Sequence, residues 1–113
     1  MRDENILESL ETDADLERAL TRRGETLVFR HSPREWQSFM AIGQVRRFAL
    51  DHPDLPVYVV DAAAHPELAR QVGLRLGVPD ESPQVILVRR GRPVWQASRE
   101  GVRHPAMTAA IAD

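Results

Sequence analysis

The chain has 113 residues, a length that suits one domain with one hydrophobic core. Fifteen basic and 17 acidic residues leave a formal net charge of −2, so no overall positive field attracts nucleic acid. The sequence contains neither Cys nor Lys, which excludes disulfides, thiolate nucleophiles, thiolate metal sites and lysine Schiff bases.

The ends and the hydropathy of the chain predict a soluble protein. No apolar run approaches the roughly 20 residues of a membrane-spanning helix. The first 20 residues carry seven acidic and two basic side chains and no apolar block, unlike a secretory signal. We therefore expect a cytoplasmic protein in which residues 1–113 form a single domain, with residues 1–11 as an acidic N-terminal segment.

The first predicted elements are a helix and a strand. Thr12 and Asp15 have the spacing of a capping box, and Gly24 supplies a stop, which together predict a helix over about 13–23. Residues 26–30 are rich in β-forming side chains without polar alternation, which predicts a strand buried on both faces.

A longer helix is predicted next. Ser32 is a good N-cap and Pro33 suits the first helical position, so the helix is expected to run from there to about Asp51. Its buried stripe is predicted from apolar spacing of three and four: Ser38, Ala41, Ile42, Val45, Phe48 and Ala49.

The remaining residues predict a strand over 57–60, a helix from Pro66 ended by Gly77, a hairpin of strands 85–88 and 93–97 turning at Gly91, and a helix over 104–112. The order is αβαβαββα. A strand–helix–strand unit implies a right-handed parallel crossover, whereas the hairpin is antiparallel. We predict an α/β, thioredoxin-like fold with a mixed four-stranded sheet and helices on both faces.

Particular residues carry a closer resemblance. The run Glu81–Leu87, followed by Gly91, Val94–Trp95 and Ala97–Ser98, resembles the C-terminal half of the monothiol bacilliredoxin-like family of the bacillithiol redox system. Phe29–Ser32 is similar to the Lys-His-Ser sequence with which that family's active-site loop begins, with Arg30 in place of Lys. The resemblance spans Leu10 to Val102.

The chain departs from this family at the reactive position. The family places a single Cys, followed by Pro, at the helix N-terminus; here Glu35 and Trp36 occupy those positions. The family's thiolate takes bacillithiol from mixed disulfides, a reaction that this chain cannot perform in that form. A carboxylate at a helix N-terminus is stabilised and therefore a weak general base, so we interpret Glu35 as structural and predict no catalytic residue.

The resemblance also implies a binding groove. Thioredoxin-like folds hold a cis proline opposite the active-site loop, so the Ser82–Pro83 bond is expected to be cis, and the residue before the proline offers backbone groups to an extended thiol peptide. The expected binding residues are His31, Ser32, Glu35, Trp36, Ser82 and Pro83. No cofactor is expected, with bacillithiol or another low-molecular-weight thiol as the candidate ligand.

A metal site is not predicted. The candidate ligands are His31, Glu35, His65 and His104, but they do not form a ligand pair at helical spacing. His65 and His104 each precede a proline at a predicted helix start, which favours a role at the helix ends.

A second apolar stripe on the long helix leaves two interpretations open. Trp36, Phe39 and Met40 lie outside its buried face. Either the N-terminal segment covers them with Ile6, Leu7 and Leu10, or they form a surface for a protein partner or for a homodimer. The arginines of the hairpin turn, at 89, 90 and 92, are interpreted as solubilising, and no nucleic acid or membrane partner is predicted.

These observations favour a redox-inert binding module that holds a thiol peptide or a protein in the groove, without enzymatic activity of its own. The alternative is a thiol-disulfide oxidoreductase of the bacillithiol system, serving cell redox homeostasis, that works with the cysteine of a partner.

Overall fold

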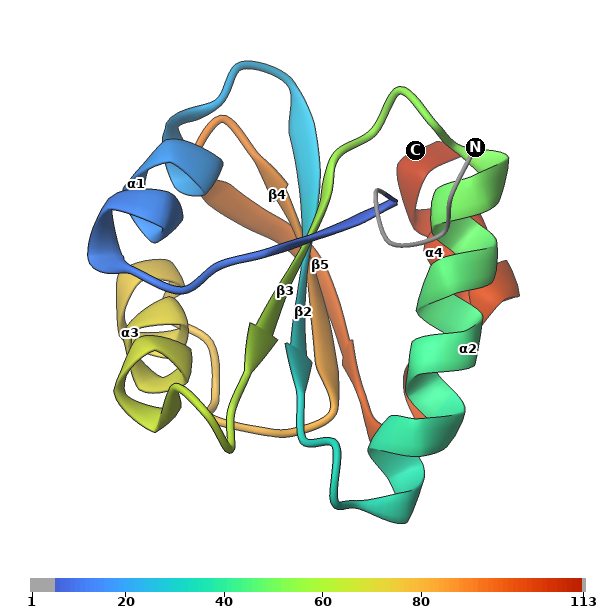
Figure 1. Cartoon of the computed structure of the whole chain (residues 1–113). Coiled ribbons are helices and arrows are strands. Elements are labelled where there is room, and N and C mark those ends of the chain that lie inside the picture. The colour runs from blue at the N-terminus through green and yellow to red at the C-terminus, as the bar shows by residue number, and fades with distance from the viewer. Residues whose placement is uncertain (1–5, 113) are drawn as a thin grey trace.

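The structure, a computed structural model, describes residues 6–112 and contains a mixed sheet between two pairs of helices (Figure 1). The strands are β1 (Leu7–Ser9), β2 (Glu25–His31), β3 (Val57–Asp61), β4 (Gln84–Arg89) and β5 (Arg92–Ser98). The helices are α1 (Asp13–Thr21), α2 (Trp36–Asp51), α3 (Pro66–Leu76) and α4 (His104–Ala112), with a short 3₁₀ turn, η2 (Arg99–Gly101), before α4.

The sheet has the strand order β1-β3-β2-β4-β5. β1 and β2 both run parallel to β3, whereas β2–β4 and β4–β5 are antiparallel. The thioredoxin-like expectation is confirmed, but four strands was one too few: β1 is a fifth, paired from Leu7 opposite Val57. Three residues with a charged Glu8 at their centre give little β-strand signal, so only the pairing with β3 reveals this strand.

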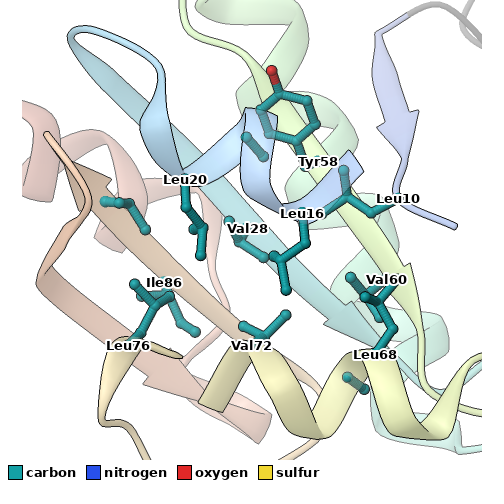
Figure 2. Packing of buried hydrophobic residues seen from close by; sticks show 13 residues of the cluster. Leu10, Leu16, Leu20, Val28, Tyr58, Val60, Leu68, Val72, Leu76 and Ile86 are labelled. Carbon is teal, nitrogen blue, oxygen red and sulfur yellow. The ribbon is translucent and has the colours of Figure 1, made fainter. Parts of the chain in front are cut away.

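Two hydrophobic cores lie on opposite faces of the sheet. Figure 2 shows the first, in which Leu16 of α1 and Val72 of α3 pack over Val28 and Ile86 of the sheet. The second lies under α2 and α4, where Phe48 and Met107 pack against Phe29. Because β2 and β4 contribute to both cores, their apolar residues do not alternate with polar ones.

Local signals fixed several helix ends. The capping box at Thr12 and Asp15 is present, and Gly77 ends α3 with φ +69°, as predicted. Helix α1, however, ends at Thr21 with Arg22 as its C-cap, and Gly24 (φ +82°) belongs to the loop beyond.

The start of the long helix was predicted too early. Residues 32–35 form a turn, closed by the Glu35 N–H donating to the Ser32 carbonyl at 2.9 Å. Ser32 is not the N-cap, because α2 begins only at Trp36 and the Ser32 hydroxyl is hydrogen-bonded to the Ser82 hydroxyl instead. Glu35 is the N-cap of α2, without a capping bond from its side chain.

Residues 6–11, the part of the N-terminal segment that the structure describes, do not cover the second apolar stripe of α2. Leu10 is buried in the first core, whereas Ile6 and Leu7 pack at the edge of the second. Trp36, Phe39 and Met40 remain 71%, 63% and 56% exposed within the described structure. Covering by this segment was therefore the wrong alternative for its described residues; the acidic residues 1–5 lie outside them.

Candidate functional site

The β2–α2 turn and the loop before β4 meet at one end of the sheet, at the bottom of Figure 1. The Ser82–Pro83 bond is cis, as the resemblance implied. The Ser32 and Ser82 hydroxyls form a hydrogen bond of 2.5 Å, which joins two loops 50 residues apart in sequence. Two of the predicted site residues are thus in direct contact.

The other predicted residues surround this contact in different ways. Pro83 is buried, and its carbonyl accepts a 2.8 Å hydrogen bond from the Arg99 N–H, so it shapes the loop rather than offering a surface. Glu35 is exposed at the N-cap of α2. Trp36, the first residue of α2, stacks on Phe39 with ring centroids 5.6 Å apart and lies open to solvent.

His31 is half-buried at the end of β2, with its ring 5.2 Å from that of Phe29. Burial lowers the pKa of His31, nearby Asp61 opposes the shift, and Arg46 adds to it. The imidazole is therefore held toward its neutral form at the base of the α2 face.

A hollow of about 360 Å³ lies between α2 and the η2–α4 segment. Its lining comes from both sides: Trp36, Gln37, Met40, Ala41, Gln44, Arg99, Glu100, Val102 and Arg103. Of the six predicted site residues only Trp36 lines it. The hollow therefore lies along α2 and the η2–α4 segment, and the serine pair is not part of its lining.

A buried arginine supports the loop from the opposite face of the sheet, and the sequence analysis missed its role. The Arg30 side chain is fully buried, and its Nη1 lies 2.6 Å from Asp80, two residues before Ser82. Burial lowers the pKa of the Arg30 guanidinium and Asp80 opposes that shift. A methyl group on Gly73 would lie 2.6 Å from Arg30 Nη2 and 3.0 Å from the Val78 carbonyl oxygen, so α3 approaches the guanidinium so closely that any added side chain requires it to move.

More polar contacts fix the loop to β5. Ser98 donates a hydrogen bond to the Glu81 carboxylate, and the Arg99 guanidinium lies 3.8 Å from the same group. Gln84, fully buried, donates to the Pro79 carbonyl at 3.2 Å and to Gln96 Oε1 at 3.0 Å. For Arg30, the sequence did contain a usable signal. A charged residue inside an apolar strand requires an acidic partner, and the Asp80–Glu81 pair could supply it.

The arrangement offers binding surface rather than an activated nucleophile. Ser32 and Ser82 contact each other, and a hydroxyl is no general base for its neighbour at neutral pH. Among residues 6–112, no three His, Asp or Glu side chains gather as ligands for a metal ion. Within the same range, no helix is both long enough and apolar enough to cross a bilayer.

Comparison with known proteins identifies the family. The family model described as "Monothiol bacilliredoxin BrxC" matches residues 8–107. The chain belongs to the monothiol bacilliredoxin family. Membership supports a role related to thiol redox chemistry, although this member has no cysteine.

Solved structures similar to this bacilliredoxin-family chain show the same fold. A putative oxidoreductase with a thioredoxin fold has a TM-score of 0.88 at 20% identity, covering 98% of both chains. Mitochondrial thioredoxin 3 from Saccharomyces cerevisiae has a TM-score of 0.78 at 12% identity and 99% coverage of both. Fasciola hepatica thioredoxin has a TM-score of 0.75 at 20% identity, covering 93% of this chain and 96% of its own.

Proposed function

We propose that the protein is a redox-inert binding module of a thiol-redox system, which holds a thiol-bearing peptide or protein at the surface formed by the two joined loops and the hollow along α2. The observation that carries this proposal is the Ser32–Ser82 contact beside a cis proline, kept in a chain whose family cysteine position holds Glu35. A small thiol such as bacillithiol is the alternative occupant, and a cytoplasmic location belongs to the same proposal.

The α2 surface supports a protein or peptide as the occupant. Trp36 and Phe39 are stacked and exposed next to the hollow, and Met40 lines its wall. Large exposed apolar side chains at the centre of a concave surface are typical anchors of binding energy. The thiol in this proposal comes from the partner, because the chain contains no cysteine.

Binding can be measured through Trp36. The Trp95→Phe variant leaves Trp36 as the single indole, and its fluorescence is followed during titration with reduced and oxidised bacillithiol and with a Cys-containing peptide and its Ser counterpart. We expect saturable quenching by the Cys peptide, weakened at least tenfold by Met40→Ala. Leu74→Ala, which truncates a comparably exposed residue of α3 away from the hollow, is the matched control.

The outcomes separate the alternatives. Quenching by bacillithiol alone would assign a small-thiol site, and no response to any of the four probes would remove the binding proposal. Reduction of insulin or of a bacillithiol mixed disulfide by the wild-type chain, abolished by Glu35→Gln, would refute the redox-inert interpretation. Sedimentation velocity of the wild type and of Trp36→Asp distinguishes a homodimer from a surface reserved for another protein.

A further inference from the structure

Five arginines gather at the end of the sheet opposite the joined loops. Arg22 and Arg23 follow α1, and Arg89, Arg90 and Arg92 flank the β4–β5 turn; both segments lie at the top of Figure 1. These residues line two adjoining hollows of about 660 and 580 Å³, which share Gly24 and Arg90. The Arg90 N–H donates to the Gly24 carbonyl at 3.3 Å and so ties the two loops together. We call these five residues the arginine cluster.

The positive charge of the arginine cluster is neutralised by almost no neighbouring carboxylate. Of the described residues, Glu25 alone is both acidic and part of the lining of the two hollows, and it is paired with Arg89. Within residues 6–112, the other four arginines have no carboxylate within ion-pair distance, although the whole chain carries a net charge of −2. The C-terminal carbonyls of α1 offset part of this charge, but only within its last turn. Concentrated positive charge of this kind attracts an anion.

The backbone holds one of these arginines in an unfavourable conformation. Arg90 has φ +55°, followed by Gly91 at φ +78°. Asn, Asp or Gly are the residues preferred at the first of two such positions in a hairpin turn. Arg90 therefore stands at a position where glycine or asparagine would be less strained, and it lines both hollows.

The chemistry of the lining defines the class of ligand. Guanidinium groups bind phosphate oxygens in pairs, with a geometry that a single ammonium does not offer. No aromatic side chain lines either hollow, which disfavours single-stranded nucleic acid, since that ligand depends on base stacking. Hollows of this size fit small molecules. We propose that the arginine cluster binds a small anion carrying two or more linked phosphate groups.

Isothermal titration with inorganic tripolyphosphate, in 150 mM NaCl at pH 7.5, tests the proposal on the full chain. We expect saturable 1:1 binding, at least tenfold tighter than that of orthophosphate. Arg22→Gln/Arg23→Gln and Arg90→Gln/Arg92→Gln should each weaken it at least tenfold. The matched control, Arg46→Gln/Arg47→Gln, removes the same charge from two exposed residues of α2 and should change it less than twofold.

Arg90→Gly provides a second readout. Because glycine adopts a positive φ without strain, this variant should raise the melting temperature without ligand while weakening tripolyphosphate binding. Absence of binding at 5 mM tripolyphosphate, or equal weakening by the α2 control, overturns the proposal. Tighter binding of an oligonucleotide through the same arginines would also overturn it, in favour of nucleic acid. Trp36→Ala should leave this binding unchanged, so the result is independent of the proposed peptide surface.

Discussion

Removing the ion-pair partner of a buried charge should lower the free energy of unfolding more than removing the buried charge itself. Arg30 is fully buried, whereas the Asp80 side chain is 69% exposed. In Asp80→Ala the buried guanidinium loses its ion-pair partner and keeps only the weaker attraction of Glu81; loss of the partner costs about 3–5 kcal/mol in fully buried pairs. Because water reaches the Asp80 side of this pair, we expect about 2 kcal/mol.

Arg30→Met should cost less, because an exposed Asp80 remains hydrated and an apolar side chain suits the first core. We expect a change within about 1 kcal/mol, and nearly the same value for the double variant Asp80→Ala/Arg30→Met. Adding Arg30→Met to Asp80→Ala should therefore recover part of the lost stability, although Arg30→Met by itself removes a large side chain.

Urea unfolding followed by far-UV circular dichroism measures these changes. With a slope of about 1.5 kcal/mol/M, a loss of 2 kcal/mol lowers the midpoint by roughly 1.3 M. Glu17→Ala is the matched control, since it breaks the exposed 2.7 Å pair with Arg75 and should cost less than about 0.5 kcal/mol. Additive losses in the double variant, or equal losses from Asp80→Ala and Glu17→Ala, would refute the reasoning.

Three further predictions concern pH, the family cysteine position and a helix cap. The folded-state pKa of His31 lies below its ordinary value of about 6.5, so protonation favours the unfolded chain. The free energy of unfolding should therefore fall as the pH drops below about 6.5, by at most about 1.4 kcal/mol per pH unit. In His31→Asn, the urea midpoint should depend less on pH between 7.5 and 5 than it does in the wild type. Glu35→Cys places a thiol at the N-cap of α2, where its pKa should lie below the usual 8.5. The pH dependence of its alkylation by iodoacetamide measures that pKa. Leu74→Cys, on the exposed face of α3, is the control, and an equal alkylation midpoint in both variants would contradict the prediction. Thr12→Ala should cost about 1 kcal/mol in thermal unfolding by removing the capping box, whereas Thr21→Ala, at the far end of α1, should cost less than half of that.

The parts of the fold that local chemistry dictates could be predicted from sequence. The Thr12–Asp15 box and the left-handed Gly77 set helix ends through contacts within one turn, and both are present. Strand β1 depends instead on pairing with residues 50 positions away, which leaves no periodic signal in three residues. The start of α2 was misplaced because the Ser32 hydroxyl is hydrogen-bonded to Ser82, 50 residues away, a contact that single-residue capping preferences do not include.

The candidate site shows the same division. The resemblance correctly indicated the cis bond at Pro83, but the hollow beside Trp36 arises where α2 meets the η2–α4 segment, two regions some 60 residues apart. The arginine cluster likewise combines two short runs, of which the sequence analysis considered only the hairpin arginines and interpreted them as solubilising. Charge brought together by tertiary structure is invisible to composition, which reports −2 for the whole chain.

The close approach of α3 to Arg30 links two positions that lie 43 residues apart in the chain. A methyl group at 73 would meet the guanidinium at 2.6 Å and the Val78 carbonyl oxygen at 3.0 Å, and only the first of these contacts disappears when residue 30 is shorter. Relatives that replace the arginine with a small side chain should thus tolerate alanine on the helix better than those that retain it. The two positions are expected to evolve as a coupled pair.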